Sequence, residues 1–298
     1  MFIKSTFASK WNFGLKKILI LRNISEMRIR PITVILLALT ITSCGEYEKL
    51  LKSSDYELKK QKVFDYYDDG KYTKSIELLE QILPRYRATE DAEQLNWINA
   101  QANYKIRDYI MAGTYYQSFA DTYPGSNNAE EALYLAAMCD YYMSPKPELD
   151  QATTRKAIES FTIFLTRYPE STRAEESRAK IKEMQEKLVE KSYMSGRLYY
   201  DLKQYRAATV SLSNSLKEYP DTKYREELMF LKLDALYMYA QKSIPTKQVE
   251  RYQAALDDYY SFIEEFPQSK YSKNVAKIFQ TTAKFLKIDT TGTPTASN

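Results

Sequence analysis

Residues 196–220, GRLYYDLKQYRAATVSLSNSLKEYP, carry a spacing of residues that recurs along the chain. Counted back from Pro220, aromatic, apolar or small residues lie at one, eight, twelve and fifteen positions, and steps of three, four and seven place them on one helical face. A fifth position, five before the proline, is Leu or Phe in four copies and Ser215 in this one. The same offsets precede four other prolines: Pro84 (a weaker copy), Pro124, Pro169 and Pro267. The five copies indicate an internal repeat.

The five prolines are 40, 45, 51 and 47 residues apart, a period typical of stacked helical hairpins rather than propeller blades. A proline directly after an aromatic residue ends a helix, because it lacks an N–H group and disfavours helical geometry at the preceding residue. The small residue twelve before the proline lets a neighbouring helix approach, and the surrounding aromatic residues fill the space around that contact. The chain holds only 7 Gly and 10 Pro. We therefore predict an all-α solenoid of about five helical hairpins.

Residues 1–43 differ from the rest of the chain. A short basic stretch, MRIR (residues 27–30), precedes the apolar run PITVILLALTITS, and this pattern predicts a signal peptide. The run is too short to span a bilayer, which needs roughly 20 apolar residues. Because a complete signal begins at Met27, we interpret residues 1–26 as an upstream extension. The alternative is a longer leader that includes the apolar stretch at residues 16–21.

The signal is followed by Ile41-Thr42-Ser43-Cys44-Gly45, which resembles a bacterial lipobox. The resemblance implies that Cys44 becomes the mature N-terminus, carries acyl chains such as palmitate, and starts a lipid-anchored linker over residues 44–52. Gly45 is not the aspartate that such proteins use for inner-membrane retention, so the outer membrane is the expected destination. The alternative is an ordinary secreted protein in which Cys44 is incidental.

The charge balance changes once the signal is removed. Residues 1–43 hold seven Lys or Arg and one acid, so 36 basic and 38 acidic residues remain, a net charge of −2. No excess of Lys and Arg is left to bind nucleic acid, and we expect no nucleic-acid partner.

The residue types argue against an enzyme. The chain has no His, no Gly-rich phosphate loop and no recognisable Ser or Cys nucleophile, and its carboxylates fall on solvated helix faces. We therefore expect no catalytic residue, cofactor or metal. Cys139 lies in an apolar helical stretch and is expected to be a small buried residue. A carboxylate pair with shifted pKa values in a deep pocket would instead support the hypothesis that the protein is an enzyme.

The repeats divide into two groups. Residues 53–171 are predicted to hold repeats one to three, and residues 172–288 repeats four and five with a closing helix. Residues 172–200 contain no proline and are expected to form one long helix joining the two groups. Loop insertions are expected at residues 144–151, SPKPELDQ, and 241–248, QKSIPTKQ. The tail, residues 289–298, has little apolar content and is predicted to be disordered.

The offsets resemble the tetratricopeptide repeat, whose motif places a small residue, an aromatic and a terminal proline at the same separations. Gly196 and Tyr199 also match its first-helix positions, whereas Lys60 in the first copy departs from them. With the lipobox in front, nearly the whole mature chain is similar to the BamD family, lipoproteins of the β-barrel assembly machinery. Ser211 stands where that family tends to carry arginine, which weakens the transfer of its docking contacts.

The resemblance implies a non-catalytic scaffold, lipid-anchored in the outer membrane and facing the periplasm, that helps fold and insert β-barrel proteins. Its implied partners are a β-barrel assembly pore protein with periplasmic modules, unfolded outer-membrane protein precursors, and the outer membrane itself. The alternative is a tetratricopeptide lipoprotein that serves a cell-wall or division-associated envelope complex.

In tetratricopeptide arrays the binding groove is formed by positions 27, 23 and 20 before the proline. An extended, aromatic-bearing precursor segment could dock there, with Tyr and Trp supplying contact area. The alternative is that these aromatics form the core between repeats. Besides Glu57, the positions hold the following candidates: Gln61, Phe64, Trp97, Gln101, Tyr104, Tyr193, Arg197 and Tyr200.

Overall fold

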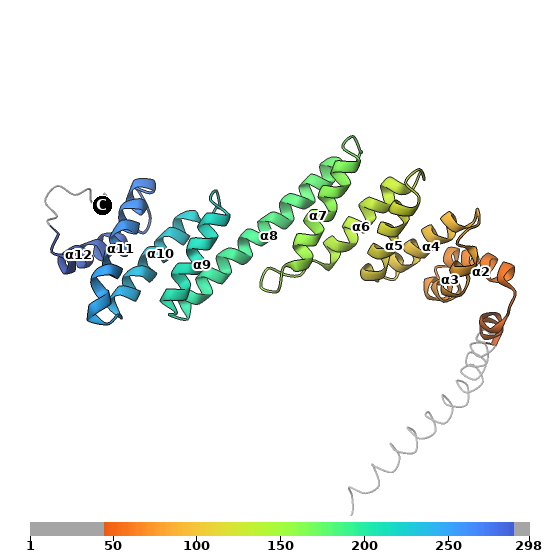
Figure 1. Cartoon of the computed structure of the whole chain (residues 1–298), viewed down its shortest axis with the longest axis horizontal. Helices are drawn as coiled ribbons and strands as arrows, with labels where there is room; N and C mark the ends of the chain where they lie inside the picture. The colour runs from red at the N-terminus through yellow and green to blue at the C-terminus, as the bar shows by residue number, and fades with distance from the viewer. Residues whose placement is uncertain (1–44, 289–298) are drawn as a thin grey trace, which may run out of the picture. The chain divides into compact units, whose positions relative to one another are not determined.

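The structure is a computed structural model and describes residues 45–288. The predictions for the signal peptide (1–43), for Cys44 and for the tail (289–298) lie outside this range. Within it, the regular elements are helices and no residue lies in a β-strand, as the repeat pattern predicts. Figure 1 shows these helices in chain order.

The chain forms two compact units that divide between Ile106 and Arg107. The first holds a helical segment at residues 45–52 and α2 (Tyr56–Asp68), α3 (Tyr72–Tyr86) and α4 (Ala92–Lys105). The second holds α5 (Tyr109–Thr122), α6 (Ala129–Met143), α7 (Ala152–Arg167), α8 (Ala174–Asp201), α9 (Tyr205–Glu218), α10 (Arg225–Gln241), α11 (Pro245–Glu265) and α12 (Ser272–Leu286).

Within each unit, successive helices pack against one another as stacked antiparallel hairpins. In the second unit α8 also contacts α10, and α10 contacts α12, so alternate helices form one layer of the stack. Figure 1 shows the helices of this unit alternating in direction. This arrangement confirms the predicted fold of tetratricopeptide-like hairpins.

The aromatic-proline pairs end their helices as predicted. Helices α5, α7, α9 and α11 each stop two residues before the proline, and the residue between them leaves helical geometry with ψ between 58° and 71°. Pro84 differs, because it lies inside α3, which continues to Tyr86. Pro84 lies in the last turn of α3, where a proline removes only a single backbone hydrogen bond. Tyr86, the last residue of the helix, is buried and donates a hydrogen bond of 2.5 Å to Glu57.

The long helix predicted at residues 172–200 is α8, with 28 residues from Ala174 to Asp201. The loop that follows α6 folds back onto the middle of this helix. Lys187 donates to the hydroxyl of Ser144 at 2.8 Å, and Lys191 donates to the backbone oxygen of Glu148 at 2.7 Å. The insertion at residues 144–151 therefore covers the middle of α8, which would otherwise be left uncovered because this helix is so long.

The second predicted insertion, at residues 241–248, is not a loop of that length. Three residues separate α10, which ends at Gln241, from α11, which begins at Pro245. The added residues lengthen the two helices instead. Proline is favourable at the first helical position, because its fixed φ suits the helix and its missing N–H has no partner there.

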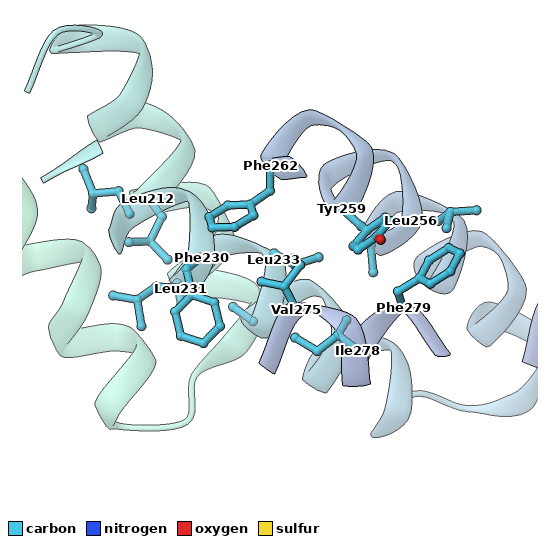
Figure 2. Packing of buried hydrophobic residues seen from close by; sticks show 14 of the residues in the cluster. Leu212, Phe230, Leu231, Leu233, Leu256, Tyr259, Phe262, Val275, Ile278 and Phe279 are labelled. Atoms are coloured by element: carbon cyan, nitrogen blue, oxygen red, sulfur yellow. The ribbon is translucent and has the colours of Figure 1, made fainter. Parts of the chain in front are cut away.

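The small and aromatic residues of the repeat build the core, as the offsets predict. Ala112, Ala157, Ala208 and Ala255 are at most 1% exposed. In the last repeat the ring of Tyr259 stacks on Phe279 with centroids 4.4 Å apart, and Figure 2 shows both residues in the packed apolar cluster. Burial of one large side chain of this kind stabilises the fold by about 1.5–3 kcal/mol.

Candidate partner-binding face

The predicted groove positions of repeat one lie on α2. Gln61 is exposed, and Phe64 is half-buried against the apolar core of the first unit. Glu57 is exposed and accepts hydrogen bonds from Tyr86 and from Lys60, at 3.0 Å for the latter. These two donors lower the pKa of the Glu57 carboxyl, with Tyr86 the larger cause. Glu57 is therefore an anion held in a local network.

The positions of repeat two lie on α4. Trp97, Gln101 and Tyr104 are each half-buried, whereas Ala100 on the same helix is completely buried. The hydroxyl of Tyr67 on α2 donates to the side-chain oxygen of Gln101 at 3.2 Å. This hydrogen bond joins α2 to α4 beside the half-buried aromatic residues Trp97 and Tyr104.

The positions of repeat four lie on α8, and their side chains contact residues of α10 and the residue just before it. The ring of Tyr193 stacks on Tyr224 with centroids 4.1 Å apart and an interplanar angle of 12°. Its hydroxyl donates to Glu227 at 3.0 Å, and Arg197 reaches the same carboxylate at 2.5 Å. Tyr200 donates a hydrogen bond to Asp234. These aromatics therefore join two repeats, although Arg197 itself remains exposed.

Burial and hydrogen bonding keep these tyrosines protonated. Burial is the larger cause that raises the pKa of Tyr193, with Glu227 raising it further and Arg197 opposing. Burial also raises the pKa of Tyr200, and the carboxylate of Asp234 adds to the effect. Both hydroxyls are therefore neutral donors at physiological pH. The joint between α8 and α10 pairs phenols with carboxylates rather than forming an open apolar groove.

The sequence reasoning missed the equivalent positions in repeats three and five. The guanidinium of Arg173 lies 4.2 Å from the ring centroid of Tyr134, and Tyr271 stacks on Phe230 with centroids 4.2 Å apart. Each contact joins the residue just before a first helix to an aromatic on the preceding first helix, as Tyr224 does with Tyr193. The inserted residues had hidden this register. Adding the eight inserted residues 144–151 to the offset of 27 gives 35 positions before Pro169 and would have found Tyr134. Phe230 lies 37 positions before Pro267, two more than the eight residues 241–248 account for.

The remaining expectations concern cysteine, metals and the membrane. Cys139 is completely buried, and this burial raises the pKa of its thiol to about 12. Among residues 45–288, no group of three or more His, Cys, Asp or Glu side chains is placed to hold a metal ion. No helix in the described part of the chain has the length and apolar character needed to cross a bilayer. Among the candidate positions, Gln61 and Arg197 are exposed, and the aromatic residues are half-buried.

Comparison with known proteins identifies relatives over most of the repeat region. A family model described as YfiO, outer membrane lipoprotein, matches residues 55–243. The outer membrane protein assembly factor BamD of Caulobacter vibrioides is 24% identical, and the match covers 68% of each chain. The proteins of the same name from Pasteurella multocida and Haemophilus influenzae are 24% and 22% identical, over 68% and 70% of this chain and 81% and 83% of theirs.

Proposed function

Because the chain belongs to the YfiO family of outer membrane lipoproteins, we propose that it is an accessory factor of outer membrane protein assembly. In this role it is a scaffold that helps β-barrel proteins fold and insert into the outer membrane. The observation that carries the proposal is the match of this chain, across the region of the repeats, to relatives named as outer membrane protein assembly factors.

The stacked hairpins suit such a role because they hold side chains of consecutive first helices in a fixed order. Trp97, Gln101 and Tyr104 on α4 provide partly exposed aromatic and amide groups within about two helical turns. An extended precursor segment with alternating aromatic residues would find contact area and hydrogen-bond partners on such a face. Arg197 adds an exposed guanidinium on α8. The proposed partners are such precursors and a barrel-forming pore protein with periplasmic modules.

The proposed attachment to the membrane is through acyl chains on Cys44, with the repeats in the periplasm. A single acyl chain holds a protein only reversibly, whereas two or three chains hold it stably. The variant Cys44→Ser should therefore leave the membrane fraction and appear in the soluble fraction of the envelope. Retention of this variant in the membrane would contradict the acyl anchor.

Affinity purification from solubilised envelopes tests the assembly role. The expected result is that a large outer-membrane barrel protein with periplasmic modules co-purifies with the tagged chain. Depletion of the chain should also lower the amount of folded barrel proteins in the outer membrane. If no such barrel protein co-purifies and barrel levels do not change, the assembly role is wrong. Recovery of cell-wall synthesis or division proteins instead would support the alternative scaffold role, which no present observation favours.

A further inference from the structure

The helical segment at residues 45–52 is part of the first unit's core. Tyr47 is 7% exposed and Leu50 is 9% exposed, and both belong to the same apolar cluster as Val63 and Ile82. The ring of Tyr47 meets Tyr66 edge-on, with centroids 5.5 Å apart. Burying two side chains of this size stabilises the contact by several kcal/mol, so the segment is held against the first hairpin.

Polar contacts hold both ends of the segment. At its start, the hydroxyl of Tyr47 donates to the backbone oxygen of Lys74 at 3.1 Å and to Glu77 at 2.5 Å. At its end, the buried ammonium of Lys59 donates to the backbone oxygen of Leu51 at 3.0 Å and to Gln81 at 2.5 Å. Lys59 is only 3% exposed, and a buried ammonium without acceptors would be costly. If the segment moved away, the buried ammonium of Lys59 would therefore lose its hydrogen bond to Leu51.

These contacts also fix the direction of the segment. It begins beside Lys74 in the first turn of α3 and ends beside Lys59, whose other partner, Gln81, lies later in α3. The chain thus enters from the end of the hairpin where α2 turns into α3. A surface depression of about 510 Å³ confirms this placement, because Glu46 lines it together with residues of that turn, among them Asp68 and Lys71.

The distance from the proposed anchor to the docked segment is short. Two residues lie between the position of Cys44 and Tyr47, so three residue steps join them. A fully extended chain spans at most about 3.3–3.6 Å per residue, or about 11 Å in all. An acylated Cys44 could therefore lie no further than this from a residue that is buried in the first hairpin. The linker between Cys44 and the docked segment is therefore very short.

The turn between α2 and α3 has a charged surface that suits contact with lipid headgroups but not insertion into the acyl layer. Two ion pairs lie at or next to it, Lys62 with Asp65 and Lys71 with Asp69, both at 2.8 Å. Paired charges of both signs are compatible with zwitterionic headgroups and would be costly to bury in hydrocarbon. The depression at this turn is lined by polar and charged residues together with Tyr66.

We propose that residues 45–52 are a rigid bracket that holds the α2–α3 turn against the lipid headgroups of the membrane bearing the anchor. The proposal rests on acylation of Cys44, which is part of the proposed function. It specifies which end of the first hairpin is next to the membrane. The opposite end of α3, near Ala88, then points away from the bilayer by about 22 Å, the length of a 15-residue helix.

Fluorescence quenching in vesicles tests this orientation. A fluorophore is attached to Asp68→Cys at the turn or to Ala88→Cys at the far end, both of which are exposed positions. The lipidated protein is placed in vesicles of phosphatidylethanolamine and phosphatidylglycerol that carry a spin-labelled headgroup. The expected result is several-fold stronger quenching at position 68 than at position 88. The lipoprotein without an added cysteine serves as the labelling blank, because Cys139 is buried.

A second variant removes the bracket without removing the anchor. A flexible Gly/Ser insertion of about ten residues between Gly45 and Glu46 adds a reach of roughly 16–19 Å. This variant should still sediment with the vesicles, but the quenching at position 68 should fall to the level at position 88. A matched insertion after Ala88 should leave the quenching at position 68 unchanged.

The outcomes separate this proposal from the proposed function. If the parent lipoprotein and the insertion variant both fail to sediment with vesicles, the anchor is wrong, and the bracket's role at the membrane is overturned with it. If both sediment but positions 68 and 88 are quenched equally in the parent, the anchor stands and the bracket is wrong. Unchanged quenching at position 68 after the insertion next to Gly45 would also overturn the bracket.

Discussion

Gly196 on α8 lies so close to Leu212 on α9 that a Cβ atom added to the glycine would sit 2.7 Å from Cδ2 and 3.2 Å from Cγ of the leucine. Leu212 is completely buried, so displacing its side chain would disturb the packing around it. The repeat therefore needs glycine at this position for the two helices to approach.

The substitution Gly196→Ala should overpack this contact. The expected loss is about 1–3 kcal/mol in the free energy of unfolding, measured by urea denaturation. Combining it with Leu212→Ala should give a loss smaller than the sum of the two single losses, because each change relieves the other. Gly125→Ala is the matched control, since an added Cβ there meets open space. Equal stability of Gly196→Ala and the parent would show that α8 and α9 are not packed this closely.

The aromatic face of α4 can be tested for precursor binding. Trp97→Ala combined with Tyr104→Ala should weaken binding of a peptide from the terminal strand of an outer-membrane barrel by on the order of 2–4 kcal/mol, measured by titration calorimetry. The melting temperature should fall much less than a core truncation would cause, because both side chains are half-buried.

The control for that experiment is Gln94→Ala, an exposed residue of the same helix. It should change neither the affinity nor the melting temperature. Unchanged peptide affinity in the double variant, or a collapse of its melting temperature, would assign Trp97 and Tyr104 to the core.

Alkaline pH should destabilise the joint between α6 and α8. Burial, with a hydrogen bond to Glu176, raises the pKa of Tyr134 to about 12 in the folded protein, compared with the ordinary value of 10.0. A raised pKa gives stability that is complete below pH 10 and is lost as the pH rises through 12, because the unfolded chain ionises first. Between these values the parent should lose on the order of 2 kcal/mol through this group.

The variant Tyr134→Phe has no phenol at this position, so its stability should fall less steeply over the same range of pH. Denaturant titrations at several pH values would measure the difference. Tyr199→Phe, at a position that is 42% exposed, should follow the parent. Parallel pH profiles for Tyr134→Phe and the parent would contradict the burial of the Tyr134 hydroxyl.

Cys139 should not react with thiol reagents in the folded protein. The thiolate is the reactive form, and burial holds the pKa of this thiol near 12. In the Cys44→Ser protein, a colorimetric thiol assay should detect no reaction at neutral pH and one thiol after denaturation. Ser118→Cys places a thiol at an exposed position of α5 and should react at once. Rapid reaction of Cys139 in the native protein would show that α6 opens readily.

The sequence by itself determined where α5, α7, α9 and α11 end and which residues of these helices share the buried face. An aromatic residue before a proline ends a helix through local sterics, and steps of three, four and seven define one face of any helix. Tyr168, at the end of α7, and Ala157, a buried residue of the same helix, are therefore found where the offsets place them. Both properties depend on residues within one helix or next to it.

Only the tertiary structure decided which groove candidates are occupied. The spacing of Tyr193 and Tyr200 places them on one helical face, but it does not show that Tyr224 and Asp234 of the next repeat engage them. The docking of residues 45–52 against α3 also leaves no mark in the repeat pattern. A helical period tells which residues share a face, but the groups that cover that face come from about 30 residues away in sequence. Their identity depends on how the hairpins pack.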